Sequence, residues 1–160
     1  MPSSRLLALA SRLRDITRNN HARLIIHTQA DIAEAVGADG IHVTSNQITA
    51  IPQIRSWLGG QAMSISASCH HIEELTAAAK QGADWATLSP VFPTLSHPGT
   101  PHLGIDVFHD LAARSPLPVV ALGGITVQNA PGLGSTPIAV IGAILDADNP
   151  SLAAKALSGE

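Results

Sequence analysis

Gly37-Ala-Asp-Gly-Ile-His-Val43 and Gly82-Ala-Asp-Trp-Ala-Thr-Leu88 are two versions of one pattern, in which a glycine precedes an apolar run. A stretch with helical spacing of its apolar residues comes before each glycine, and glycine often ends a helix. The run that follows is typical of a buried strand. The repeated pattern therefore predicts helix–strand units and an α/β fold with parallel strands.

The rest of the chain extends this alternation to six candidate strands. Helical spacing continues between them, so helix and strand alternate along the whole chain. Strands joined in this way form a barrel or an open doubly wound sheet, and the spacing alone leaves both open. A Gly-x-Gly-x-x-Gly turn is missing after the first strand, which disfavours a dinucleotide-binding open sheet. Further strands are expected at 23–27, 63–68, 118–122 and 138–141, and helices at 4–19, 30–36, 72–80, 105–113 and 152–157.

Length and composition bound the kind of protein. A chain of 160 residues builds one ordinary core, so we expect one domain over residues 1–160. The net charge is −3 and the basic residues are scattered, which favours a small-molecule partner over nucleic acid or a membrane surface. The start of the chain does not resemble a signal peptide, and no apolar stretch is long enough to span a bilayer. We infer a cytoplasmic protein.

Glycines follow the last two candidate strands. Gly123 and Gly124 come after the run 118–122, and Gly142 comes after the run 138–141. In α/β barrels the turns after the last two strands often bind phosphate, because glycine lets the backbone approach the anion closely. We therefore predict a phosphate site at these three glycines, although glycine is also common in turns that bind nothing.

The segment Ser66-Ala-Ser-Cys-His70 ends the strand at 63–68. Alternate residues of a strand share a face, so Ser66, Ser68 and His70 are expected to point the same way. A serine–histidine nucleophile pair is conceivable, but no acidic residue is placed to orient the histidine, which disfavours hydrolysis. We interpret Ser68 as a hydrogen-bonding ligand contact and Cys69 as a buried apolar residue.

Four histidines lie at or just beyond the ends of candidate strands: His27, His42, His70 and His97. Their convergence would allow a metal centre, but the spacing matches no known ligand pattern. Local hydrogen bonding or substrate contact is the commoner role, so we predict no metal site.

Between about residues 23 and 144 the chain resembles thiamine phosphate synthase and the related thiazole tautomerase. The resemblance implies a TIM-type (βα)8 barrel that joins an aminopyrimidine pyrophosphate to a thiazole phosphate, with Mg²⁺ holding the pyrophosphate. It implies also that the first strands of the barrel precede Met1, so that the barrel is incomplete, with about six parallel strands present. Four segments carry the resemblance: Val36–Val43; Ser66–His70 with Glu73 and Glu74; Gly82–Trp85 with Ser89–Thr94; and Pro118–Ile125.

The resemblance assigns roles to individual residues. It places Ser68 at the pyrophosphate, Thr94 and Ser96 beside the thiazole phosphate, and Gly123, Gly124 and Gly142 in the backbone cradle of a phosphate. His97 stands where the family has a lysine. The expected substrate-binding side chains are therefore those of Ser68, His70, Thr94, Ser96 and His97.

Both magnesium carboxylates of the family are replaced. His27-Thr28 stands where the family has Asn-Asp, and Thr44-Ser-Asn-Gln47 stands where it has Gly-Gln-Glu-Asp. Mg²⁺ is thus the cofactor by resemblance, but its ligands are missing, and we expect weak or absent synthase activity. The segments 67–71 and 93–99 are similar to the synthase-like domains fused to Nudix hydrolases, which also depart from the magnesium motif.

Two further readings compete with a thiamine-phosphate synthase. One is a non-catalytic, regulatory or salvage module that binds thiazole phosphate, thiamine phosphate or pyrophosphate. The other is an unrelated barrel enzyme acting on sugar phosphates, which would need strand-end carboxylates or lysines that we do not find.

Six strands of an eight-strand design leave strand edges unpaired. Open edges are templates for association, so we expect a homodimer or higher oligomer. The expected interface includes Leu6, Leu9 and Leu13 or the strand around 24–26.

Overall fold

The computed structural model describes residues 3–94, 99 and 101–158. These residues form two compact units. The first unit comprises Met1–Ser68 with Ala77–Trp85, and the second comprises Cys69–Thr76 with Ala86–Glu160. The chain therefore passes between the units within strand β3 (Ser64–Cys69), helix α4 (Ile72–Gln81) and strand β4 (Trp85–Leu88).

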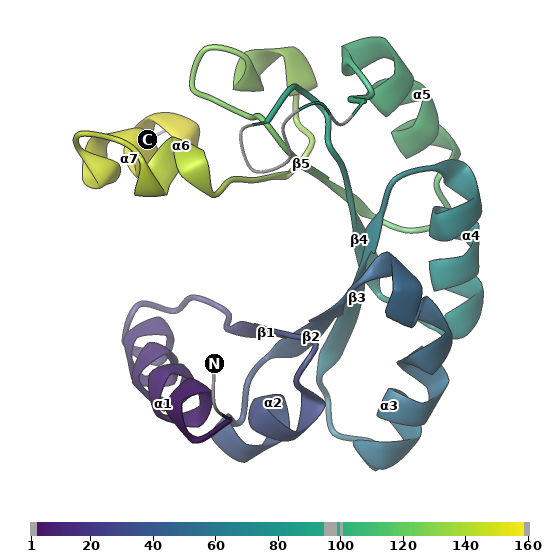
Figure 1. Ribbon diagram of the computed structural model, residues 1–160, viewed down its shortest axis with the longest axis vertical. Coiled ribbons are helices and arrows are strands. Elements are labelled where there is room, and N and C mark those ends of the chain that lie inside the picture. The colour runs from purple at the N-terminus through teal and green to yellow at the C-terminus, as the bar shows by residue number, and fades with distance from the viewer. Residues whose placement is uncertain (1–2, 95–98, 100, 159–160) are drawn as a thin grey trace. The chain divides into compact units, whose positions relative to one another are not determined.

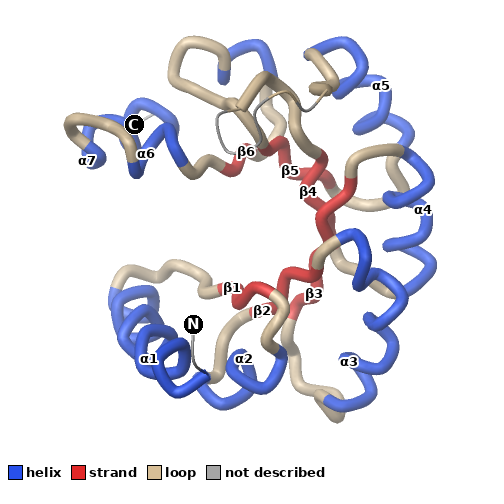
Figure 2. Tube along the Cα trace, viewed as in Figure 1, coloured by secondary structure: helices blue, strands red, loops and turns tan. Residues whose placement is uncertain are grey.

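Helices and strands alternate along the chain, as the repeated glycine pattern predicts (Figure 1). In the part of the chain that the structure describes, six strands form one sheet in the order β1-β2-β3-β4-β5-β6, which confirms the α/β class and the expected six strands. The registered pairs β1–β2, β2–β3, β4–β5 and β5–β6 are all parallel. The strands are drawn in red in Figure 2. Sequential parallel strands are the arrangement of an incomplete TIM-type barrel. The remaining elements are α1 (Ser3–Asn19), β1 (Ile25–His27), α2 (Ala30–Val36), β2 (Gly40–Val43), η1 (Ser45–Ala50), α3 (Ile51–Trp57), α5 (Ile105–Arg114), β5 (Val119–Leu122), η2 (Ala130–Leu133), β6 (Ile138–Ala139), α6 (Gly142–Leu145) and α7 (Pro150–Ser158).

The core of the first unit lies on one face of its strands. Ile41 of β2 is paired in register with Ile65 of β3, and both are fully buried. Because side chains alternate along a strand, His42 and Ser66 lie on the opposite face, where they too are paired in register. The sheet of the first unit thus has an apolar face and a polar face.

The repeated Gly-Ala-Asp pattern has a role beyond ending helices. The Asp39 carboxylate accepts a hydrogen bond from the Leu24 backbone N–H at 2.7 Å and pairs with Arg14 of α1. The Asp84 carboxylate accepts one from the Ile65 backbone N–H and one from Arg55 of α3, both at 2.6 Å. Each aspartate therefore ties a helix to the amino end of a strand. The repeat predicted the units but not this anchoring.

Helix α3 was not expected from the sequence. Pro52 stands in its first turn, where a missing backbone N–H leaves no hydrogen bond unmade. Strand β6 is shorter than the apolar run 138–141 predicts, since only Ile138 and Ala139 pair with β5. None of the helices in the described ranges is long and apolar enough to cross a membrane.

The residues of the expected oligomer interface differ in exposure. Leu9 and Leu13 of α1 are 41% and 39% exposed. Leu24 and Ile26, in contrast, are buried within the first unit at 8% and 7%. Ile25, between them, is half-buried, so both surfaces named above keep accessible side chains, and an oligomer through either of them stays a prediction.

Candidate functional site

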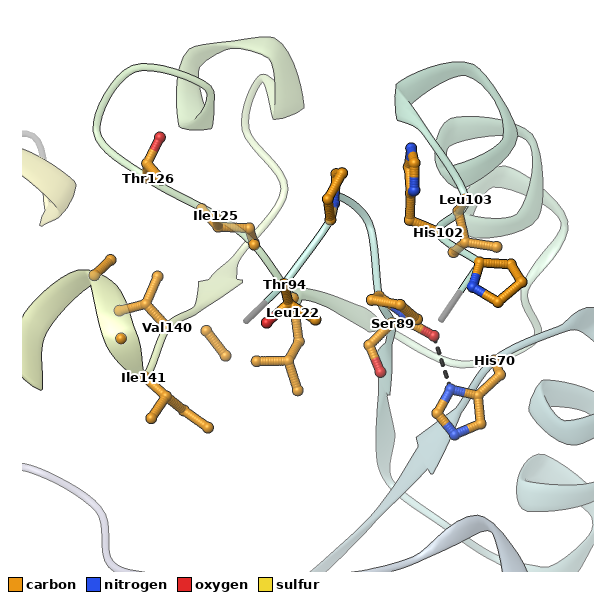
Figure 3. A pocket seen from close by; sticks show the side chains of 18 of the residues that line it. His70, Ser89, Thr94, His102, Leu103, Leu122, Ile125, Thr126, Val140 and Ile141 are labelled. Atoms are coloured by element: carbon orange, nitrogen blue, oxygen red, sulfur yellow. Dashed lines mark hydrogen bonds between the residues drawn. The ribbon is translucent and has the colours of Figure 1, made fainter. Parts of the chain in front are cut away.

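A cavity of about 870 Å³ opens in the second unit, at the carboxyl ends of its strands (Figure 3). Most of its lining surface is apolar, with hydroxyl, imidazole and carboxylate groups among the lining side chains. A concave, mainly apolar site with a few polar groups is the usual form of a small-molecule pocket. The cavity is lined by residues 89–90, 93–94, 101–103, 122–126 and 139–143, together with His70 and Asp146.

The double-glycine turn after β5 holds a second segment of the cavity wall. Gly123 and Gly124 both adopt positive φ, at 97° and 65°. The Leu122 and Gly123 carbonyls accept hydrogen bonds from the backbone N–H groups of Val91 and Phe92 at 2.9 and 3.0 Å. The segment that leads to Thr94 is thereby fixed against the turn.

Glycine is required at both positions of this turn by close packing. A Cβ atom on Gly123 would lie 2.7 Å from the Cα of Pro90, and one on Gly124 would overlap the Pro93 carbonyl oxygen. Sequence reasoning assigned these glycines to the approach of a phosphate. The structure gives them a further reason, which is the approach of residues 90–93.

Asn129 braces the same turn from its other side. Its side-chain amide donates to the Gly124 carbonyl at 2.9 Å, and its side-chain oxygen accepts from the Thr126 backbone N–H at 2.8 Å. Fixed backbone groups need no reorganisation when a ligand binds, so a braced turn favours recognition.

Gly142 lies in the same cavity, at the start of α6. The sequence did not indicate Asp146, which is a neighbour of Gly142 in the structure. Its carboxylate would lie 2.8 Å from a Cβ atom on Gly142, and its backbone N–H donates to the Gly142 carbonyl. Helix α6 has only four residues, and an acidic side chain beside its start disfavours an anion there. The double-glycine turn is thus the better-placed part of the predicted cradle.

His70 is held at the cavity edge by a main-chain contact. Its Nδ1 lies 2.7 Å from the Ser89 carbonyl oxygen, drawn as a dashed line in Figure 3. A carbonyl only accepts, so Nδ1 carries a proton and Nε2 is the nitrogen left for other partners. The His70 backbone N–H donates to Glu74 at 2.6 Å.

The structure brings several predicted site residues into one cavity. His70, Thr94, Gly123, Gly124 and Gly142 all line it. The sequence reasoning missed His102, which also lines the cavity. Ser96 and His97 lie outside the described residues.

Ser68 belongs to the first unit, where it shares a hydrogen-bond network with Ser66 and His42. His42 Nδ1 lies 2.8 Å from Ser66 Oγ, and His42 Nε2 lies 2.8 Å from Ser68 Oγ. The expectation that the two serines share a face is confirmed. His70 lies beyond the end of β3 and bonds Ser89 instead.

Burial sets the protonation of His42 and Cys69. Burial, with a smaller effect from nearby His27, lowers the pKa of His42 to about 4. The Cys69 side chain is fully buried, which raises the pKa of its thiol to about 12. Cys69 is thus the buried apolar residue that its position in the strand predicted.

The residues at the magnesium positions of the family do not fit that ion. Thr28 and Gln47 are neutral, and the Gln47 side-chain oxygen already accepts from the Thr44 backbone N–H and hydroxyl at 3.3 and 3.1 Å. Mg²⁺ prefers carboxylate oxygens and water. Within the described ranges, no three His, Cys, Asp or Glu side chains gather to hold a metal ion.

Known proteins resemble this chain over nearly its full length. A thiamine-phosphate synthase of Prochlorococcus marinus is 35% identical over 99% of the chain, and the chain spans 46% of that protein. A thiamine-phosphate synthase of Chloroflexus aurantiacus is 34% identical over 92% of the chain and 69% of that protein. The solved thiamine phosphate pyrophosphorylase from Pyrococcus furiosus is 29% identical, with a TM-score of 0.87 over 99% of this chain and 77% of that one.

The family model for thiamine monophosphate synthase matches residues 1–146. This match includes the double-glycine turn, the segment that leads to Thr94 and the repeated Gly-Ala-Asp pattern. The chain therefore belongs to the thiamine monophosphate synthase family.

Proposed function

We propose that the chain binds a phosphate-bearing small molecule of thiamine biosynthesis, thiazole phosphate or thiamine phosphate, in the cavity of the second unit. The observation that carries this proposal is the braced double-glycine turn facing a cavity that also contains Thr94. Backbone amides of such turns and a threonine hydroxyl are ordinary ligands of a phosphate group. Family membership supports the thiamine-related identity of the ligand.

The same proposal includes weak or absent synthase activity. Departing pyrophosphate carries several negative charges, which a divalent ion or basic residues would have to stabilise. Thr28 and Gln47 supply no charge, and the Gln47 oxygen is engaged by Thr44. This observation favours a non-catalytic binding module, with a regulatory or salvage role, over a synthase.

Calorimetric titration tests the binding. Thiazole phosphate, thiamine phosphate and pyrophosphate are each titrated with and without Mg²⁺. Saturable binding of thiazole phosphate or thiamine phosphate that is indifferent to Mg²⁺ is expected. If neither compound binds at millimolar concentration, the proposed ligand is wrong.

A coupled assay tests the activity. The chain is incubated with aminopyrimidine pyrophosphate, thiazole phosphate and Mg²⁺, and thiamine phosphate is measured. Turnover at an ordinary enzymatic rate, about 1 s⁻¹ or more, that requires Mg²⁺ would overturn the argument from the missing carboxylates.

A further inference from the structure

The wall of the cavity in the second unit contains a carboxylate but no basic side chain. Asp146 is the acidic residue among the described residues that line it, and these include no Lys or Arg. The sequence accounts for this, because residues 81–113 and 115–154 contain neither residue type. The second unit therefore places no guanidinium or ammonium group at the cavity wall to offset the charge of a bound phosphate.

The whole second unit has a charge of the same sign as Asp146. Its ranges contain seven acidic and two basic residues, whereas those of the first unit contain five acidic and seven basic residues. One of the two basic residues, Arg114, is paired with Asp110 at 2.7 Å. Charges of one sign sum to a field that acts beyond single contacts. The second unit therefore disfavours a ligand with several uncompensated negative charges, such as pyrophosphate.

Asp146 lies close to the predicted phosphate cradle. Leu122 and Ala139 are paired in register, so the double-glycine turn and Gly142 follow neighbouring strand ends. The Asp146 backbone N–H donates to the Gly142 carbonyl at 2.9 Å, which places Asp146 one helical turn further on. None of the ion pairs among the described residues involves Asp146. The cavity thus combines backbone donors for an anion with an unpaired carboxylate that favours a cation.

We propose that Asp146 makes the cavity selective for a phosphate ester that carries its own positive charge on an adjoining ring. The ring of thiazole phosphate is neutral at pH 7, whereas the same ring in thiamine phosphate is quaternised at nitrogen and permanently cationic. Of the two ligands in the proposed function, thiamine phosphate is then the one bound more tightly. This selectivity rests on the proposed function for the phosphate ester itself and adds the residue that distinguishes the two compounds.

Such a preference suits a binding module better than a synthase. A synthase has to release thiamine phosphate after each turnover, so tight retention of the cationic product slows it. A binding module needs the opposite property, because it has to distinguish the joined compound from its thiazole part. The charge of Asp146 and the loss of the magnesium carboxylates at Thr28 and Gln47 therefore favour the same role.

Calorimetry with two ligands of nearly equal size tests the selectivity. The first is thiazole phosphate, and the second is its N-methylthiazolium analogue, which adds one methyl group and one positive charge and lacks the pyrimidine. At low salt the unsubstituted protein is expected to bind the analogue about three- to tenfold more tightly. This ratio should decrease as the salt concentration is raised to about 0.5 M, because Asp146 is exposed and its charge is screened.

Two substitutions that remove the same charge identify the residue. Asp146→Asn should reduce the ratio of the two affinities at least about threefold, whereas Asp148→Asn should change it less than about twofold, since Asp148 does not line the cavity. Asp146→Glu should retain the preference, because it retains the carboxylate.

The outcomes separate this proposal from the proposed function. Equal affinity for thiazole phosphate and its analogue, or a preference that persists in Asp146→Asn, would overturn the role of Asp146 and leave the proposed function standing. If thiazole phosphate, the analogue and thiamine phosphate all fail to bind at millimolar concentration, the proposed function is wrong and the selectivity is wrong with it.

Discussion

Replacement of Gly124 by alanine probes the link between the double-glycine turn and the cavity wall. The added Cβ atom would overlap the Pro93 carbonyl oxygen and lie 2.8 Å from the Phe92 Cβ atom. It would also force an alanine to φ near 65°. Because the obstructing atoms include backbone, residues 92–93 must move away, and the hydrogen bond from the Phe92 N–H to the Gly123 carbonyl is the first to be lost.

The size of the effect has two parts. A left-handed conformation costs a non-glycine residue about 1–2 kcal/mol, and overpacking adds about 1–3 kcal/mol. Gly124→Ala is thus expected to destabilise the protein by about 2–5 kcal/mol. Gly37→Ala is the matched control, because Gly37 has φ 60° and its nearest obstacle is the mobile end of Arg18 at 3.4 Å. The control should cost only the conformational part, about 1–2 kcal/mol.

Urea unfolding followed by circular dichroism measures the difference between the two variants. Hydrogen exchange supplies the local readout, since the Val91 and Phe92 amides should lose protection in Gly124→Ala and keep it in Gly37→Ala. Equal destabilisation by both substitutions, with full protection of these amides, would refute the close-packing argument.

Three further outcomes are expected. The hydrogen bond from Arg14, and after it the one from the Leu24 N–H, lowers the pKa of Asp39 below its ordinary value of 3.8. The ionised Asp39 carboxylate therefore stabilises the folded protein above pH 3.8, and this stabilisation is lost as the pH falls through the lower pKa of the folded state. In this acid range the stability of Asp39→Asn should depend less on pH than that of the unsubstituted protein. Buried Cys69 should resist thiol reagents in the native protein at pH 8 and react only in urea, and rapid native labelling would contradict its burial. Asp146→Asn should increase the affinity for thiazole phosphate about two- to fivefold at low salt, because it removes a negative charge from the cavity lining. Calorimetry measures the affinity, and Asp148→Asn is the control because Asp148 does not line the cavity.

The fold could be predicted from the sequence because its units repeat a local signal. The glycines at 37 and 82 end helices, and the apolar runs after them are strands that alternate between a buried and a second face. Helix α3 was missed because its seven residues give too short an apolar period and include a proline. Strand β6 is shorter than its apolar run because only Ile138 and Ala139 pair with β5. How many residues pair depends on the partner strand and cannot be read from the apolar run itself.

The site could be predicted only in part, because some of its contacts are set by register. The glycines after the last two strands were found from their position along the chain, and they do line one cavity. The relation of His42 to Ser66 depends on the parallel register of β2 and β3, which the sequence does not fix. Asp146 was missed because it lies one helical turn after Gly142, at the end of a helix that is too short for an apolar period to reveal.

The departures from the family motif and the anchors of the fold lie at opposite ends of the strands. Asp39 and Asp84 bond backbone at the amino ends, whereas Thr28 and Gln47 follow the carboxyl ends of β1 and β2. In barrel folds the residues at the carboxyl ends of the strands carry the chemistry, and those at the amino ends stabilise the fold. Replacing metal ligands at the carboxyl ends therefore need not destabilise the sheet. Gln47 goes further, because its side chain completes a capping box with Thr44 at the start of η1. A carboxylate that bound Mg²⁺ at this position could not also cap the helix, whereas Gln47 stabilises the first turn of η1.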